Sequence, residues 1–253
     1  MSIPKVLHYC WFGHNPLPSA AIKCIKSWKK YCPDYEIREW NEDCFDISSN
    51  LYMLEAYQTG NWAFVSDYAR LKIIYDHGGI YLDTDVELLR PLDSLLSQNG
   101  FMGFQDDVLV ASGLGFGAVK GHPVIRELLQ DYDNLSFIGP DGSLDLTPCP
   151  DRNTKTLLRL GLKNNTGNIQ NIQGMSVYPP EYFCPMNYYT GFIKRTANTY
   201  SIHHYAASWV SSEAKSFIDH DRRMAKLEQL IGPKLFCVLK NIWHKMKREN
   251  TDF

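Results

Sequence analysis

The stretch SDYARLKIIYDHGGIYLDTD, residues 66–85, predicts a helix, a double-glycine stop, a short buried strand and a closing pair of carboxylates. Helical spacing of apolar residues extends the expected helix over 63–77, and Gly78-Gly79 ends it. The apolar residues 80–82 form the expected strand, which leads into Asp83 and Asp85. Side chains two apart on a strand point to the same face, so both carboxylates should leave the strand side by side.

The pair of carboxylates indicates a nearby cation. Unpaired carboxylates are costly to remove from water, so packing alone does not account for Asp83 and Asp85 at the end of a buried strand. Mg²⁺ and Mn²⁺ prefer oxygen ligands and often take one or two carboxylates, with substrate phosphates completing the shell. The alternative is a solvated turn, because D-x-D triplets also arise by chance.

Asp67 and Arg70 lie three residues apart and share one face of the expected helix. A carboxylate and a guanidinium fixed together can grip vicinal sugar hydroxyls by charge-assisted hydrogen bonds. The alternative is an ordinary surface salt bridge, which contributes little to stability. The position of the two residues one helix before Asp83 favours the sugar-binding interpretation.

Helices and strands alternate along the chain, which predicts an α/β fold with a mostly parallel or mixed sheet. Residues 136–152 and 41–49 read as loops. The strands are expected at 5–12, 35–40, 80–82, 86–89, 101–104, 108–119, within 168–183, and at 199–206. The helices are expected at 20–30, 51–59, 63–77, 123–132, 154–160 and from 212 onward, with a break at Gly232-Pro233.

Composition narrows the class of protein. A net charge of -2 gives no overall attraction to nucleic acid, so no nucleic-acid partner is expected. Seven cysteines without a CxxC pair favour free thiols in a reducing compartment over a zinc site. The N-terminus has no signal-peptide pattern. The sequence contains no run of about 18 apolar residues, so no membrane span is predicted. We therefore expect a cytoplasmic protein, or one held at the inner face of the cytoplasmic membrane.

The run AFVSDYARLKIIYDHGGIYLDTDVELLRPLD, from residue 63, resembles the central segment of glycosyltransferase family 32. That family contains bacterial capsular and O-antigen sugar transferases, and it is distantly related to the glucosylating domain of large clostridial toxins. The opening IPKVLHYCWFGHNPLP and the later IHHYAASW are similar to the family over shorter stretches, so the resemblance spans roughly residues 3–210.

The resemblance implies a GT-A fold: a Rossmann-like nucleotide-binding half with a mixed sheet, a variable acceptor region and C-terminal helices. It places the catalytic domain at 1–210, with the donor half at about 1–120 and the acceptor region at about 121–210. Residues 211–253 would form a helical, basic amphipathic tail. It also implies a nucleotide-sugar donor, a Mn²⁺ or Mg²⁺ ion, and retention at the anomeric carbon.

By the same resemblance, each motif residue has an implied role. Asp85 would bind the metal directly, while Asp83 would contact the ribose or donor sugar and reach the metal through water. Asp67 and Arg70 would hold the sugar hydroxyls. Trp11 would stack on the base, with uracil favoured, and Asn41 would lie near the ribose.

The late residues His203, His204, Ser208 and Trp209 form a further group. Related metal-dependent transferases place a histidine after a late strand, where it completes the metal shell, and a nearby tryptophan donates to the diphosphate. An imidazole ligand favours Mn²⁺ over Mg²⁺. Adjacent strand residues face opposite ways, so His203 and His204 are alternatives, with His203 preferred. A structural or solvent-facing pair is the other interpretation.

The acceptor side is less defined. Retention requires either a nucleophile beneath the sugar or a front-face reaction in which the leaving phosphate deprotonates the acceptor. Asp106 and Asp151 are the candidate catalytic carboxylates here; a solvated loop is the alternative for each. The neighbouring acids in the same segments are Asp107, Asp141 and Asp145.

Residues 234–248, KLFCVLKNIWHKMKR, are basic and amphipathic and contain no acid. Such a helix can lie on an anionic membrane, which would suit an acceptor linked to a lipid diphosphate. The alternative is a helix that packs on the protein and presents a basic face.

Together with these residues, the resemblance implies a retaining, metal-dependent hexosyltransferase. It would move a hexose or N-acetylhexosamine from a nucleotide diphosphate sugar, with UDP favoured, to a glycan in capsule, O-antigen or other surface polysaccharide biosynthesis. One alternative is a non-catalytic nucleotide-sugar or carbohydrate-binding module. Another is a phosphohydrolase, which would need more clustered ligands for two metals. The glycine-rich residues 113–117 lack the helix and distal acid of a dinucleotide site, and no Walker sequence is present.

Overall fold

The computed structural model describes residues 2–206, 212–232 and 235–236. The chain divides into two compact units. The first contains Met1–Pro185 and Lys194–Trp209, and the second contains Met186–Ile193 and Val210–Phe253. The candidate site residues that the structure describes all belong to the first unit.

The first unit is built on a seven-stranded mixed sheet with the order β2-β1-β3-β6-β5-β8-β7. Strand β1 pairs in parallel with β2 and β3, and β5 pairs in parallel with β8, whereas β6 is antiparallel to both neighbours. A second sheet contains two antiparallel strands, β4 and β9. The strands are β1 (Val6–Cys10), β2 (Glu36–Trp40), β3 (Gly79–Tyr81), β4 (Val86–Leu88), β5 (Gly100–Gly103), β6 (Phe116–Ala118), β7 (Gln170–Ile172), β8 (Met175–Tyr178) and β9 (Ser201–His203).

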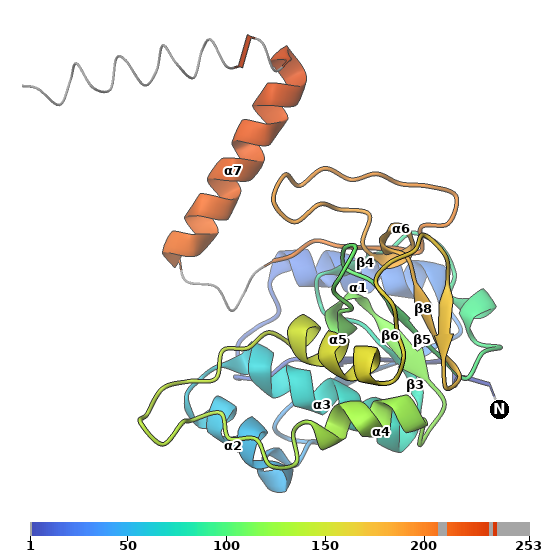
Figure 1. Ribbon diagram of the computed structural model, residues 1–253, viewed down its shortest axis with the longest axis vertical. Coiled ribbons are helices and arrows are strands. Elements are labelled where there is room, and N and C mark those ends of the chain that lie inside the picture. Colours follow the sequence, from blue (N-terminus) through green and yellow to red (C-terminus); the bar gives the residue numbers. More distant parts are fainter. Residues whose placement is uncertain (1, 207–211, 233–234, 237–253) are drawn as a thin grey trace, which may run out of the picture. The chain divides into compact units, whose positions relative to one another are not determined.

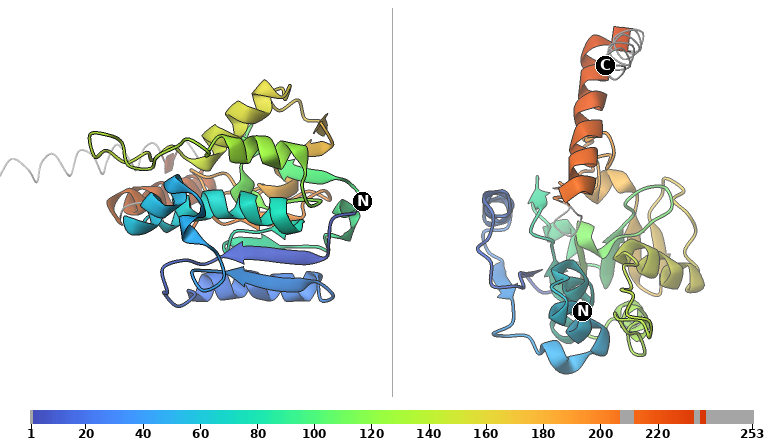
Figure 2. Two further views of the ribbon diagram at one scale, coloured as in Figure 1. Left: turned by 90° about the horizontal axis from the view of Figure 1, so that it is seen from below. Right: turned by 90° about the vertical axis from the view of Figure 1, so that its left-hand side faces the viewer.

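Helices cover both faces of the large sheet, with α1 on one side and α3, α4 and α5 on the other (Figures 1 and 2). Alternate strand residues enter the two cores: Ile80 packs on the α1 side, and Tyr81 packs on the α3 side. The prediction of an α/β fold with a mixed sheet is confirmed. The helices are α1 (Ser19–Tyr31), α2 (Leu51–Gln58), α3 (Trp62–His77), α4 (Pro123–Gln130), α5 (Cys149–Arg159), α6 (Pro180–Phe183) and α7 (Ser212–Ile231), with 3₁₀ turns at Ile47–Ser49, Asp93–Leu95 and Ser112–Leu114.

The double glycine ends α3 as the sequence predicts. Gly78 has φ of 68° and its N–H donates to the carbonyl of Ile74, while Gly79 has φ of 105°. Both values lie in the left-handed region that favours glycine. A Cβ on Gly78 would also lie 2.8 Å from the backbone nitrogen of Lys120. The chain therefore turns directly from α3 into β3, which places the end of the helix beside the sheet.

Three sequence-based boundaries are corrected by the structure. Residues 108–119 do not form one strand, because only Phe116–Ala118 is extended in the sheet and Ser112–Leu114 is a 3₁₀ turn. Helix α5 begins at Cys149 rather than 154, with Pro150 in its first turn, where a missing N–H costs nothing. Pro180 likewise starts the short helix α6 where the sequence indicated only strand and loop.

Across the described part of the chain, no helix is both long and apolar enough to cross a bilayer.

A fully buried histidine joins β1, β2 and the end of α3. Nε2 of His8 lies 3.0 Å from the carbonyl of Gly78, and Nδ1 accepts from the indole N–H of Trp40 at 3.0 Å. A carbonyl only accepts, so Nε2 carries the proton and the ring is neutral. Burial lowers the pKa of His8 to about 4, and the hydrogen bond to Gly78 opposes this only in part.

We predict that protonation of His8 lowers the stability of the fold at acidic pH. The unfolded ring binds a proton below its ordinary pKa of about 6.5, whereas the folded ring binds one only near pH 4. Stability should therefore fall as the pH drops through this window, by about 2 kcal/mol between pH 7.5 and 5. Urea unfolding of the wild type and His8→Gln at both pH values measures the effect. An equal pH dependence in the two proteins would contradict it.

Candidate active site

The carboxylates of Asp83 and Asp85 come from a tight turn between β3 and β4. The carbonyl of Asp83 accepts the N–H of Val86 at 3.0 Å, and residues 84 and 85 form the turn. The expectation that the pair continues a strand is therefore wrong. Asp and Thr favour such turns, and this one brings both carboxylates to the same side by a different geometry. The turn lies at the edge of the sheet where the parallel strands β1 and β3 end.

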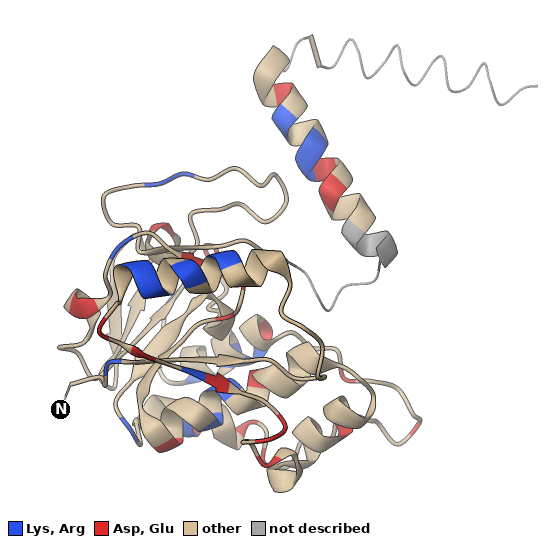
Figure 3. Cartoon of the chain, turned by 180° about the vertical axis from the view of Figure 1, so that it is seen from behind, with Lys and Arg blue, Asp and Glu red and all other residues tan. Residues whose placement is uncertain are grey.

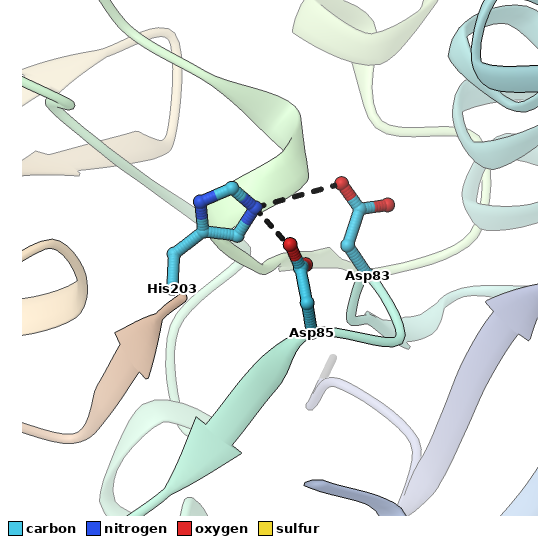
Figure 4. Close-up of side chains that lie close together, drawn as sticks. All are labelled: Asp83, Asp85 and His203. Carbon is cyan, nitrogen blue, oxygen red and sulfur yellow. Dashed lines mark ion pairs between the residues drawn. The ribbon is translucent and has the colours of Figure 1, made fainter. Parts of the chain in front are cut away.

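His203 completes a cluster with the two carboxylates (Figure 4). Strands β4 and β9 pair with Val86 opposite His203, which brings the end of β9 to the turn. Nε2 of His203 lies 3.1 Å from Oδ1 of Asp85 and 4.0 Å from Oδ2 of Asp83. One ligand atom from each of the three residues falls within 4.8 Å of the others. Two oxygens and one nitrogen thus converge as a possible set of metal ligands.

The backbone after β9 holds Asp85 in place. The N–H of Ala206 donates to Oδ2 of Asp85 at 2.7 Å, and the N–H of His204 donates to the carbonyl of Asp85 at 3.0 Å. The side chain of His204 points elsewhere, with Nε2 2.8 Å from Oε2 of Glu87. The structure therefore brings His203 to the carboxylate pair and directs His204, the alternative ligand, to a separate acid on β4.

Arg70 connects this cluster to α3. Its Nη2 lies 3.1 Å from Oδ1 of Asp67 and 3.3 Å from Oδ1 of Asp83. The guanidinium also donates from Nε to the carbonyl of Ser66, and the hydroxyl of Tyr81 donates to Oδ1 of Asp83 at 2.9 Å. Arg70 and Asp67 are 4% and 7% exposed, which excludes the alternative of a surface salt bridge. The guanidinium of Arg70 thus bridges the carboxylate of Asp67 on α3 and that of Asp83 in the turn.

The charges of the cluster are unequal. Burial raises the pKa of Asp67 to about 6 although Arg70 opposes it, and burial likewise raises the pKa of Asp83 against the same guanidinium. For Asp85, burial is outweighed by His203, which lowers the pKa of this carboxyl; the carboxylates in turn raise the pKa of His203 against its burial. Three carboxylates face one permanent cation, so an added divalent cation would relieve the excess negative charge.

Gly113 lets the turn carboxylate approach the glycine-rich segment. A Cβ at this position would lie 2.5 Å from Oδ2 of Asp83 and 3.3 Å from Nη1 of Arg70. Gly113 belongs to the 3₁₀ turn that precedes β6, so within the segment 113–117 it is Gly113 that allows close packing against these two side chains. Only a hydrogen atom fits where any other residue would place a carbon.

Gly113→Ala should impair the cluster more than the fold. The added methyl group would displace the carboxylate of Asp83, at a stability cost of about 1–3 kcal/mol and at least about a tenfold loss of affinity for a divalent metal ion. Gly100→Ala is the matched control, because its Cβ would meet the flexible end of Met175 at 2.9 Å and Nε2 of His122 at 3.1 Å, neither of which belongs to the cluster. Mn²⁺ affinity and thermal unfolding of both variants are compared. Equal Mn²⁺ affinity in the two variants would argue against this role of Gly113.

A polar wall beside Arg70 was not apparent from the sequence. The thiol of Cys149, at the start of α5, lies 3.7 Å from Nη1 of Arg70 and 3.7 Å from the hydroxyl of Ser112. The amide of Asn153 donates to the same hydroxyl at 3.1 Å. Asn153 is a fully buried polar residue inside a helix, an unfavourable position that could have marked it as a candidate.

Trp11 and Asn41 lie at the ends of β1 and β2, on the same edge of the sheet as Asp83. The indole N–H of Trp11 donates to the carbonyl of Asn15 at 2.5 Å. The side chain of Asn41 accepts the N–H of Asp43 and donates to Glu39. Both side chains thus hold their own loops in this structure, and neither is an ion-pair or hydrogen-bond partner of the cluster among the described residues.

The two candidate acceptor-side carboxylates lie at the surface. Oδ1 of Asp106 accepts the N–H groups of Val108 and Leu109 within a tight turn. Asp151 is exposed in the first turn of α5, where an acid suits the helix dipole. Of the neighbouring acids, Asp145 pairs with Arg152 at 2.5 Å. Within the described part of the chain, neither Asp106 nor Asp151 forms an ion pair or hydrogen bond with the cluster. Ser208 and Trp209 lie outside the described residues.

The comparisons with known proteins bear on the same segment. The family model described as "Glycosyltransferase sugar-binding region containing DXD motif" matches residues 18–102, which contain Asp67, Arg70, Asp83 and Asp85. The resemblance found from the sequence is confirmed over this segment.

Two curated relatives are transferases by name. The chain is 29% identical over 140 residues to inositol phosphoceramide mannosyltransferase 3 of Schizosaccharomyces pombe, covering 54% of this chain and 39% of the relative. It is 36% identical over 73 residues to human alpha-1,4-N-acetylglucosaminyltransferase, covering 28% of this chain and 20% of the relative. The match thus spans less than half the length of each relative.

Among solved structures, the PaToxG glycosyltransferase is similar at 21% identity with a TM-score of 0.47, covering 62% of this chain and 69% of that chain.

Proposed function

We propose that this chain is a metal-dependent, retaining glycosyltransferase with a GT-A fold. It would transfer a hexose or an N-acetylhexosamine from a nucleotide diphosphate sugar, with UDP favoured, to a glycan acceptor in surface polysaccharide assembly. One observation carries the proposal: Asp83 and Asp85, in the segment that matches a DXD glycosyltransferase family, converge with His203 of β9 within 4.8 Å. The turn that holds the two carboxylates thus belongs both to the matched sugar-binding region and to a set of metal ligands.

The donor set fits a divalent metal ion. Two carboxylate oxygens and an imidazole nitrogen suit Mn²⁺, and Mg²⁺ is the second choice because it prefers oxygen ligands. When bound, such an ion offsets the negative charge that grows on the leaving diphosphate. Asp85 and His203 would hold it directly, and Asp83 would hold it through water or contact the ribose. Breaking the Asp85–His203 ion pair would free both groups as ligands.

Asp67 and Arg70 would hold the donor sugar. Arg70 is fixed by two carboxylates, the carbonyl of Ser66 and the thiol of Cys149, so one N–H on Nη1 is left to donate to a sugar hydroxyl in a defined direction. Asp67 is buried next to it and can accept hydrogen bonds from the same hydroxyls. Trp11 would stack on the base and Asn41 would lie near the ribose, since both follow parallel strands at the edge where open sheets bind ligands. Trp209 would contact the diphosphate.

The names of the relatives support the substrate class. One transfers mannose, a hexose, and another transfers N-acetylglucosamine, an N-acetylhexosamine. On the acceptor side, Asp106 and Asp151 are the proposed carboxylates. A lipid-diphosphate-linked acceptor would suit a protein located at the inner face of the cytoplasmic membrane. The basic residues 234–248 would then make a peripheral membrane contact. The structure describes only residues 235–236 of this segment.

A screen of nucleotide sugars tests the proposal. A ligand that binds only the folded state raises the melting temperature, so one nucleotide sugar should do so in the presence of Mn²⁺ and not with EDTA. The same donor should then be hydrolysed slowly without an acceptor. Stabilisation without hydrolysis would indicate a binding module instead. If no nucleotide sugar shifts the melting temperature with Mn²⁺, the proposed function is wrong.

A further inference from the structure

Helix α7 of the second unit presents an apolar stripe with a seven-residue repeat. Phe217, Met224 and Ile231 recur every seven residues, and Leu227 and the polar His220 fall between them at coiled-coil spacing. Phe217 is 72% exposed and Leu227 is 40% exposed, while Met224 and Ile231 are half-buried. Large apolar side chains are seldom left in water along a continuous stripe, so the repeat indicates a surface that binds a partner.

The opposite face of α7 is already covered by its own unit. Nε of Arg222 donates to the carbonyl of Tyr188 at 3.1 Å, and a Cβ on Gly191 would lie 3.4 Å from Cδ of Arg222. At about 100° per residue, Arg222 lies about 140° from Phe217 and on the far side of the helix from the stripe. Among the described residues, the loop 186–193 therefore contacts α7 on the face opposite the repeat.

The residues that flank the stripe show which partner fits. Acids stand on one side, at Asp221 and Glu228, and Arg223 stands on the other; Figure 3 shows this mixture of charges along α7. With Phe217 at position a of the heptad, Arg223 is a g residue and Glu228 is the e residue that follows it five positions later. In a parallel pair of α7 helices, g of one helix faces this e of its partner, so Arg223 would meet Glu228 of the second copy.

Leu230 occupies the following g position and is 83% exposed. A parallel pairing would place this leucine beside the central stripe, one residue before α7 ends at Ile231. An antiparallel pairing would instead place like positions together, with Arg223 facing Arg223 and Glu228 facing Glu228.

We propose that α7 is a dimerisation helix that pairs in parallel with α7 of a second copy of this chain. A membrane surface fits the helix less well. Residues 216–232 contain three basic residues (Arg222, Arg223, Lys226) and three acids (Asp219, Asp221, Glu228), a net charge of zero. Anionic lipid attracts net positive charge, which α7 lacks and the later residues 234–248 have. This inference does not depend on the proposed transferase activity.

Light scattering on the full chain tests the dimer. The wild type should show twice the chain mass of 29.1 kDa at micromolar concentration, and Leu227→Glu should be monomeric. Arg223→Glu should weaken dimerisation about tenfold, and the exchange Arg223→Glu/Glu228→Arg should restore it to within about threefold. Lys226→Glu, the same charge change outside the pairing surface, is the matched control. Circular dichroism checks that each variant keeps its helix content.

The outcomes separate the alternatives. A monomeric wild type, or equal weakening by Arg223→Glu and Lys226→Glu, overturns the proposal. A third outcome would assign the stripe to a membrane instead: the wild type forms no dimer but floats with phosphatidylglycerol vesicles, and Leu227→Glu abolishes this flotation. Donor hydrolysis by Leu227→Glu should match the wild type, so a failed dimer test leaves the proposed function standing.

Discussion

Asp85→Asn is expected to abolish metal-dependent transfer, with a loss of at least about a thousandfold in turnover. The amide removes the negative charge and one good oxygen ligand from the cluster with Asp83 and His203. The fold should persist, because the amide oxygen can still accept the N–H of Ala206, which donates to Asp85 at 2.7 Å. Donor hydrolysis and transfer, each with and without Mn²⁺, measure the effect.

Glu87→Gln provides the matched control for this variant. Glu87 stands two residues later on β4 and pairs with His204 at 2.8 Å, so the same loss of charge occurs outside the cluster. Turnover should stay within about threefold of the wild type. The melting temperature of Asp85→Asn should no longer respond to Mn²⁺, whereas that of Glu87→Gln should respond normally. Near-normal turnover by Asp85→Asn would contradict the assignment of the cluster.

The central segment could be predicted from the sequence because its signals are local. Apolar spacing fixed the extent of α3, and the two glycines fixed its end, since their left-handed φ values suit few other residues. The shared helix face of Asp67 and Arg70 follows from their spacing alone. The structure confirms these three features, and the match of the family model to residues 18–102 covers the same segment.

The rest of the cluster depends on contacts between distant parts of the chain. The choice of His203 over His204 is fixed by the pairing of β9 with β4, in which Val86 faces His203. No local pattern encodes that register. The turn at Asp83–Asp85 was mistaken for a strand end because spacing i and i+2 puts side chains together in both geometries.

The charge of the site also depends on burial that the sequence does not show. Asp67 and Arg70 have the spacing of a common surface pair, and only the packing of α4, α5 and the 3₁₀ turn around α3 buries them. Cys149 and Asn153 lie beside Arg70 and Ser112 because α5 starts five residues earlier than expected. Sequence patterns thus located the acids and the arginine, and the surrounding packing determined their interaction.

Arg70→Met is expected to cost about 3–5 kcal/mol in the free energy of unfolding, because it leaves buried carboxylates without their cation. The guanidinium lies 3.1 Å from Asp67 and 3.3 Å from Asp83, and both carboxyl groups already have raised pKa values because of burial. Lys72→Met on the same helix is the control. Its partner Asp76 lies 2.6 Å away in a half-exposed pair, so its loss should cost at most about 1 kcal/mol.

The pH dependence of the Arg70→Met defect separates charge from packing. Loss of the guanidinium should raise the pKa of Asp67 further above its present value of about 6, because burial then acts unopposed by Arg70. A carboxyl whose folded pKa exceeds its unfolded value binds more protons when folded, so stability rises as the pH falls through the folded pKa. The deficit of Arg70→Met relative to wild type should therefore shrink between pH 8 and pH 5, while that of Lys72→Met stays constant. Urea unfolding at both pH values measures this, and a deficit that does not change with pH would show that Arg70 acts through packing rather than through its charge.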